Sequence, residues 1–416
     1  MPDIAGIPYY EVTFAADGTL SSDGGLPAAV AGGTITNLFM FSHGWNDGES
    51  SALGLYQDMF TLIAGMLAPA VGNPAFVGIF WPSLLFPEDD PSKPDTPSTG
   101  AQLARVLTPA FPGQATNLAT MGSLLDTQPQ DPAQLDNFHE LASGLVTTLP
   151  LADEDTGPQA MIDGSTSAVF GYAASLAKTP VGNAQGLPNP FTTLWSGARE
   201  VLRTMSYYEM KNRAGVIGQN GLGPLLGSLA GAHAPLRLHL MGHSFGARLV
   251  SFALAGLPGT AVGAASPVKS LSLLQGAFSH FSFAKPTPCS AVPAGALADV
   301  VNRVDGPLLS TFTAADRAVG WWYPAASALA HQDSQSLTDL TYQWGGMGHD
   351  GFQQLPAATT VTLKDKGNAY RFTKGTVYPL DSNSVIKADQ SAFSGAHSDI
   401  RHPEVAWAVV SAAATA

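Results

Sequence analysis

Residues 236–257 read LRLHLMGHSFGARLVSFALAGL and set the expectation for the fold. Positions 236–241 are apolar enough for a short buried strand, and 245–257 is apolar almost throughout, which is typical of a buried helix. The pentapeptide Gly242-His243-Ser244-Phe245-Gly246 lies between them. A strand, a GxSxG sequence and a helix in this order predict a strained turn that carries the serine, with small residues two positions away on each side.

Short apolar runs alternate with helical patterns in the rest of the chain, which predicts an α/β fold with a mostly parallel central sheet flanked by helices. A run that is apolar at nearly every position suits a strand buried on both faces of such a sheet. The expected strands cover 9–14, 35–42, 76–81, 236–241, 268–275 and 307–313, with 385–387 closing the sheet. The expected helices cover 52–67, 245–257, 295–303 and a final segment around 405–412. A further helix is expected around 201–208, because Val201, Leu202, Met205 and Tyr208 would share one face.

Residues 83–195 interrupt this alternation, because they are rich in Pro, Gly, Thr and Asp and contain no clear strand. We therefore expect a core built from 1–82 and 196–416, with 83–195 as a large insertion. Apolar residues among its prolines would suit a lid or cap over a binding site, and an ordinary packed subdomain is the alternative interpretation.

The composition excludes several classes of protein. The 416 residues include 19 Lys and Arg and 32 Asp and Glu, a formal charge of 19 − 32 = −13, and no basic cluster, so nucleic acid is not an expected partner. Hydrophobic residues make up 45% and charged residues 12%, which excludes a wholly disordered chain. No apolar run reaches about 18 residues, so no membrane-spanning helix is expected.

The N-terminus and the cysteine count narrow the expectation further. The start MPDI lacks the basic residues and apolar block of a signal peptide, which favours a cytoplasmic location, with a secreted mature form as the alternative. Cys289 is the single cysteine, so neither an internal disulfide nor a multi-cysteine zinc site is expected. The acidic clusters 88–90 and 153–155 lack EF-hand spacing and are interpreted as solvated loops, and no metal or cofactor is expected.

A serine hydroxyl needs a base within hydrogen-bond reach before it can act as a nucleophile. Among ten histidines, His397 is the preferred candidate, because it lies in a loop of small residues between the last expected strand and the final helix. His402 and His349 are the weaker alternatives. His243 adjoins Ser244, but the same turn should direct its ring away from the serine hydroxyl, so it is not the expected base. We expect His243 to contribute to substrate binding instead.

An acid must orient the histidine and stabilise its charged form. Asp316 follows the expected strand 307–313 and is the preferred candidate, with a helix-capping aspartate as the alternative interpretation. Asp305 precedes that strand, at the opposite end of the sheet. Asp333 and Asp339 lie deeper in an irregular region.

The sequence His43-Gly44-Trp45 follows the buried strand 35–42. A His-Gly turn at that point suits a loop whose backbone N–H groups hold a developing oxyanion, and the amides of Trp45 and Phe245 are the two expected donors. We also expect His43 and Gly44 to contribute to substrate binding. A glycine-rich turn with a core tryptophan is the alternative.

Together these features resemble the α/β-hydrolase superfamily of serine hydrolases. Ser244, Asp316 and His397 follow the chain order of that superfamily, Gly-His-Ser-Phe-Gly is similar to its nucleophile elbow, and His-Gly-Trp resembles the oxyanion loop of lipases and esterases. The resemblance covers roughly 35–81, 200–320 and 380–414. It implies hydrolysis of a small-molecule or lipid-like carboxylic ester through an acyl-enzyme, although the 83–195 insertion is far longer than the matching connection in a minimal member.

Other activities use the same machinery, so the alternatives within this class are a thioesterase, a peptidase or amidase, a polyester hydrolase and an acyltransferase. An alternative of another class is a non-catalytic α/β-hydrolase scaffold that binds a small molecule or a partner.

Overall fold

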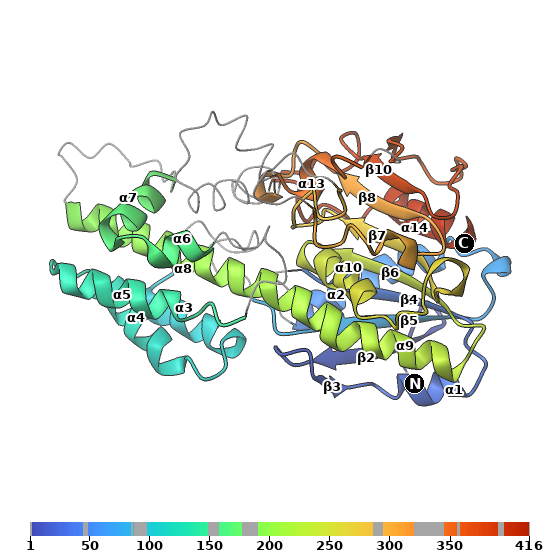
Figure 1. Cartoon of the computed structure of the whole chain (residues 1–416), viewed down its shortest axis with the longest axis horizontal. Coiled ribbons are helices and arrows are strands. Elements are labelled where there is room, and N and C mark those ends of the chain that lie inside the picture. The colour runs from blue at the N-terminus through green and yellow to red at the C-terminus, as the bar shows by residue number, and fades with distance from the viewer. Residues whose placement is uncertain are drawn as a thin grey trace.

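The computed structural model describes residues 2–44, 49–84, 86, 98–148, 158–176, 190–285, 294–319, 345–355, 358–389 and 395–415. These residues form an α/β fold, in which helices cover both faces of a mostly parallel central sheet (Figure 1). The expected fold class is confirmed at this level.

Within the described residues, ten strands form the sheet, and nine of them follow the order β1-β2-β5-β4-β6-β7-β8-β10-β9, with β3 paired to β2. The pairs β1/β2 and β2/β3 are antiparallel and all the others are parallel. The carboxyl ends of the parallel strands therefore lie along one edge. The strands are β1 Asp3–Ile4, β2 Ile7–Phe14, β3 Leu20–Ser22, β4 Asn37–Ser42, β5 Pro74–Phe80, β6 Arg237–His243, β7 Val268–Leu274, β8 Leu308–Phe312, β9 Val361–Thr362 and β10 Val377–Asp381.

The central strands are apolar on both sides because both faces of the sheet are covered. All six residues of β4 are buried: Leu38 and Met40 pack into one hydrophobic cluster, while Phe39 and Phe41 pack into the other. The second cluster lies under α2 (Glu49–Ala64) and α14 (Pro403–Thr415).

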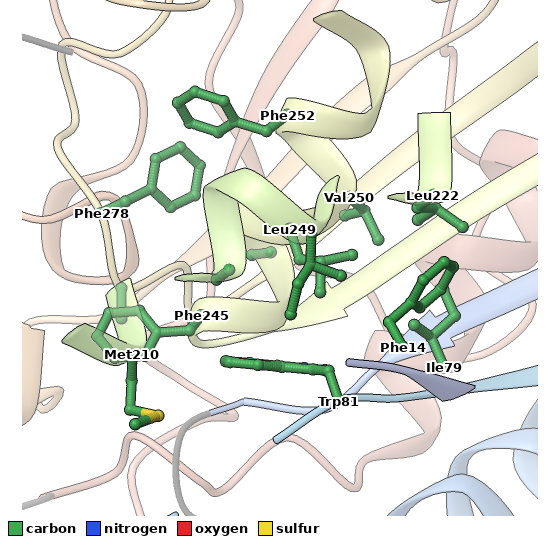
Figure 2. Close-up of a cluster of buried hydrophobic side chains, with 14 of the residues drawn as sticks. Phe14, Ile79, Trp81, Met210, Leu222, Phe245, Leu249, Val250, Phe252 and Phe278 are labelled. Atoms are coloured by element: carbon green, nitrogen blue, oxygen red, sulfur yellow. The ribbon is translucent and has the colours of Figure 1, made fainter. Parts of the chain in front are cut away.

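The first cluster lies under the helices of the opposite face, which are α1 Leu26–Ala31, the C-terminal part of α8 Pro190–Val216, α9 Gly223–Ala232 and α10 Phe245–Ala255. The π-helix η5 (Ile217–Leu222) joins α8 to α9. Figure 2 shows the centre of this cluster, where Leu249 and Phe245 of α10 lie among apolar side chains of other elements. These include Phe14 of β2, Ile79 of β5, Trp81 just after β5 and Met210 of α8. This packing holds α10 rigidly against the sheet.

The described parts of the 83–195 segment contain helices and no strand. It contains α3 Gly100–Leu107, η3 Thr108–Ala110, α4 Ala115–Thr127, α5 Pro132–Ser143, α6 Pro158–Asp163 and α7 Thr166–Leu176. The expected boundary between 195 and 196 falls inside α8, which runs without a break from these helices to the sheet (Figure 1). The apolar face predicted there is buried at Val201, Leu202, Met205 and Tyr208.

A buried polar network ties this insertion to the core. Glu209 of α8 accepts hydrogen bonds from the backbone amides of Thr147 and Thr148, both at 2.9 Å, and pairs with Arg213 at 3.1 Å. Arg213 in turn donates to the carbonyl oxygens of Pro82 and Ala110. Because these groups are buried, their mutual hydrogen bonds are needed to offset desolvation.

Two sequence predictions are wrong. Residues 295–303 form turns and the short 3-10 helix η7 (Val301–Arg303) instead of a helix, because the amides of Gly295 and Leu297 bond to the carbonyls of Ala284 and Ser282. Residues 385–387 do not close the sheet, since β10 (Val377–Asp381) pairs in parallel with β8 and β9 lies beyond β10 at this edge. Of the remaining elements, η1 covers Pro69–Val71, η6 covers Gly263–Ala265 and α13 covers Met347–Asp350.

Among the described residues, no helix combines the length and apolar character that crossing a membrane requires.

Candidate active site

Ser244 lies at the turn between β6 and α10 in a backbone conformation that is rare for a side-chain-bearing residue, with φ 57° and ψ −122°. The flanking glycines make this turn sterically possible. A Cβ at Gly242 would lie 2.2 Å from the Gly246 carbonyl oxygen, and a Cβ at Gly246 would lie 2.1 Å from the Ser42 carbonyl oxygen. The expectation of a strained turn with obligatory small neighbours is confirmed.

His397 lies between Ser244 and Asp316 and contacts both. The distance from Ser244 Oγ to His397 Nε2 is 2.8 Å, and the distance from His397 Nδ1 to Asp316 Oδ2 is also 2.8 Å. An ionised carboxylate only accepts hydrogen bonds, so Nδ1 carries a proton and Nε2 is left as the acceptor for the serine hydroxyl. All three side chains are buried. The structure therefore brings together three residues that are 72 or more positions apart in the chain.

The loop that carries His397 is attached to the loop that carries Asp316. The two form an antiparallel bridge between Asp316 and Gly395, and the Ala396 amide donates to the Ala315 carbonyl at 3.0 Å. Gly395 has φ +56°, and a Cβ there would lie 2.3 Å from the Ala315 oxygen. A glycine at 395 thus permits the close approach that aligns the imidazole with the carboxylate.

The carboxylate of Asp316 is fully buried and held at both oxygens. Oδ1 accepts the Val319 amide at 3.0 Å, and Oδ2 accepts the Gln275 side-chain amide at 2.9 Å in addition to His397. These hydrogen bonds satisfy the buried carboxylate oxygens and fix their orientation toward His397.

The His243 ring is directed toward the backbone of His397, whereas the Ser244 hydroxyl contacts the His397 ring. His243 Nε2 lies 3.0 Å from the main-chain oxygen of His397, and the two rings pack with centroids 5.0 Å apart. Burial, with the neighbouring His397 as the second cause, lowers the pKa of His243 to about 3, so the ring is neutral and donates from Nε2. This places His243 behind the histidine loop, as a support for its backbone.

The loop after β4 approaches Ser244 through Gly44. The Gly44 carbonyl is held by His43 Nδ1 at 3.0 Å and by the Ser83 hydroxyl at 3.0 Å. His43 stacks on Trp81 with an interplanar angle of 11°, and burial lowers its pKa to about 4, so the ring is neutral. His43 therefore fixes the path of this loop from inside the core.

Of the two expected oxyanion donors, Phe245 lies within the described part of the chain. Phe245 is the first residue of α10, where backbone amides point out of the N-terminal end of the helix toward the Ser244 side and the helix dipole favours negative charge. Trp45 lies outside the described residues.

The other histidines and aspartates considered for the site make different contacts or lie outside the described residues. His402 pairs with Asp399 at 2.9 Å, and Asp305 pairs with Lys269 at 2.7 Å. His349 Nδ1 lies 3.3 Å from the main-chain oxygen of Asp316, so its ring borders the acid without replacing His397. Asp333 and Asp339, the acidic clusters 88–90 and 153–155, and Cys289 lie outside the described residues.

The described residues contain no group of three or more His, Cys, Asp or Glu side chains arranged to hold a metal ion. Sequence reasoning missed Gln275 as part of the site. Its signal was a polar residue directly after Leu273 and Leu274, at the end of the expected strand and at the same edge of the sheet as Ser244. Comparison of the chain with protein-family models, with curated proteins and with solved structures found no match.

Proposed function

We propose that this protein is a serine hydrolase of the α/β-hydrolase superfamily that cleaves carboxylic esters. The observation that carries the proposal is the continuous hydrogen-bonded chain from Ser244 Oγ through His397 to Asp316, with 2.8 Å at each step, on a strained strand-to-helix turn. Nucleophile, base and orienting acid in this geometry are what acyl transfer requires. The positions of the three residues beyond the carboxyl ends of β6, β8 and β10 support the superfamily assignment.

In the proposed reaction, Ser244 Oγ attacks the ester carbonyl carbon while its proton passes to His397 Nε2. The tetrahedral intermediate collapses, the bond to the alkoxide breaks, and His397 returns the proton to the leaving alcohol. Water then attacks the acyl-enzyme with the same histidine as base, which releases the carboxylic acid and restores the serine. Asp316 holds the imidazole in the tautomer that both steps need and stabilises its charged form.

The developing oxyanion would be stabilised by the amide of Phe245, at the N-terminal end of α10, and by the amide of Trp45. The helical insertion 83–195, anchored to the core by Glu209 and Arg213, would serve as a cap that limits which esters reach Ser244. A small-molecule or lipid-like ester is the proposed substrate class.

The test is labelling by a fluorophosphonate probe, together with hydrolysis of a short p-nitrophenyl ester. The wild type should be labelled once, at Ser244, and Ser244→Ala should lose labelling and lower turnover by several powers of ten, roughly the scale for loss of a triad member. Ser251→Ala is the matched control. Ser251 is a buried serine on α10 whose hydroxyl donates to the Ala247 carbonyl of the same helix. A wild type that is neither labelled nor active would favour the non-catalytic scaffold.

An ester, thioester and anilide panel separates the activities that share this machinery. Preference for the oxygen ester is the expected result. A higher kcat/KM on the thioester or the anilide would assign the protein to the thioesterases or to the amidases instead.

A further inference from the structure

Gln275 is fully buried beside the candidate acid, in a backbone conformation that side-chain-bearing residues rarely adopt. It follows β7 directly, has φ +46° and is one of five non-glycine residues with positive φ in the described part of the chain. Such a conformation persists only where surrounding contacts stabilise it, and it is concentrated at functional sites.

Every polar group of the Gln275 side chain has a partner. Nε2 donates to Asp316 Oδ2 at 2.9 Å and to the Gly348 carbonyl at 2.8 Å, while Oε1 accepts from Thr311 Oγ1 at 2.9 Å. Both groups opposite Nε2 are acceptors, so the amide has one favourable orientation and cannot flip. Thr311 also accepts the Gln275 backbone amide at 2.9 Å, which locks the residue at both ends.

Gln275 contacts the same Asp316 oxygen as His397, the candidate base. Asp316 Oδ2 receives the Gln275 amide and the His397 imidazole together, at 2.9 and 2.8 Å. Gly348 makes room for this arrangement, because a Cβ there would lie 2.8 Å from the Gln275 backbone carbon and 3.0 Å from Asp316 Oδ2. The amide thus fixes the direction of Oδ2 and withdraws part of its negative charge.

We propose that Gln275 is a positioning residue for the Ser244–His397–Asp316 system, which sets both the orientation of Asp316 and the basicity of His397 through the shared oxygen Oδ2. This inference rests on the proposed hydrolase function. Gln275 acts on the base through Asp316 Oδ2, which it shares with His397.

Two variants test the proposal with opposite pH signatures. Gln275→Leu removes the donor, so Asp316 should stabilise the charged imidazole more strongly and the acid-side midpoint of the kcat/KM profile should move to higher pH. Its kcat should fall roughly 10- to 100-fold, the scale of one hydrogen bond to a charged group, with KM within about twofold of the wild type.

Gln275→Glu keeps the size of the side chain. When protonated it can still donate to Asp316, and when ionised it repels Asp316, because two carboxylates this close share one proton. The activity of Gln275→Glu relative to the wild type should therefore fall as pH rises, whereas that of Gln275→Leu should rise. If Gln275→Leu does not fold, Gln275→Glu carries the test.

Asn212→Leu is the control for loss of a buried amide, since Asn212 is fully buried and donates to the Thr148 carbonyl, inside the insertion anchor. It should lower Tm and leave the shape of the pH profile unchanged. The proposal is overturned if the Gln275 variants keep the wild-type profile, or lose activity by one factor at every pH so that the shape of the profile stays unchanged as in Asn212→Leu. A wild type that is not labelled by the fluorophosphonate probe would instead overturn the hydrolase function itself.

Discussion

Gly44 packs against Ser244 so closely that a Cβ at position 44 would lie 2.5 Å from the Ser244 Cβ and 3.2 Å from its Oγ. The loop after β4 and the turn after β6 are thus in contact at the candidate nucleophile. Neighbouring parallel strands β4 and β6 create this contact, since their register aligns Ser42 with Gly242. The absence of a side chain at 44 is consequently a requirement of the site.

Gly44→Ala should therefore displace Ser244 or the loop and lower ester turnover roughly 100-fold, the scale for a shift of about 1 Å at a reacting group. Gly54→Ala is the matched control: Gly54 lies in α2 with no heavy atom within 4 Å of an added Cβ, so the change should stabilise the helix by about 0.5–1 kcal/mol and leave turnover unchanged. Steady-state kinetics and thermal melts check both. Full activity in Gly44→Ala would contradict the packing argument.

Asp316→Asn should lower kcat by about 10⁴ at neutral pH, as the same change does in Ser-His-Asp enzymes. The physical reason is that Oδ2 accepts from both His397 and Gln275, so an NH₂ group in that place faces donors and favours the wrong imidazole tautomer. Asp305→Asn, at the other end of β8 and paired with Lys269, should leave kcat unchanged. Equal kcat values for the two variants would remove Asp316 from the mechanism.

Three buried histidines should make the fold sensitive to acid. Burial lowers the pKa of His43 to about 4 and of His239 and His243 to about 3, whereas the unfolded chain titrates near its ordinary 6.5. Below that pH the unfolded state binds more protons, so the stabilisation is fully present above pH 6.5 and is lost as pH falls toward 4 and 3. At pH 5 each histidine should cost on the order of 2 kcal/mol relative to pH 7.

Urea unfolding at pH 7, 6 and 5 measures this loss, and His239 offers the cleanest variant. It lies in β6, with Nδ1 2.9 Å from Ser270 Oγ and Nε2 3.1 Å from Asn37 Oδ1. His239→Gln lowers stability at every pH but removes one titrating group, so the dependence on pH should become shallower. An unchanged slope would show that this histidine does not control the acid response.

The buried pair of Glu209 and Arg213 should be important for stability. Arg213→Met leaves Glu209 with a buried charge and leaves the Pro82 and Ala110 carbonyls without their guanidinium donor, so unfolding should become easier by about 3 kcal/mol. Lys285→Met, which breaks an exposed pair with Asp299, should have a far smaller effect. Chemical denaturation of both variants compares them directly.

Several elements were predictable because their signals are local. The strands at 35–42 and 76–81 are mainly apolar, whereas those at 268–275 and 307–313 mix apolar residues with Ser, Thr, Lys or Gln. Each of the four is present within two residues of its expected ends. The prediction at 385–387 failed for a reason visible in β10, whose sequence VYPLD contains Pro379. A proline lacks the backbone N–H that donates in a sheet, so a strand at 377–381 is difficult to predict from the sequence. Parallel pairing with β8 forms there nevertheless.

Residues 295–303 show the opposite error. Their composition favours a helix, but the amides of Gly295 and Leu297 bond to carbonyls at 284 and 282 instead of completing helical turns. Helix propensity is a weak preference that such tertiary hydrogen bonds outweigh. The expected boundary between 195 and 196 falls within α8, because this one helix packs against both the insertion and the core.

The strand–elbow–helix unit around Ser244 followed from the amino-acid order, since glycines at 242 and 246 and the flanking apolar runs act on near neighbours in the chain. The sequence suggested His397 as the partner of Ser244, but the contact itself, the role of His243 behind it and the donation from Gln275 to Asp316 came from the packed molecule. Those contacts join residues 41 to 154 positions apart. Distances across such separations depend on how the strands order themselves in the sheet and on the loops bridged at its carboxyl edge, which no local pattern encodes.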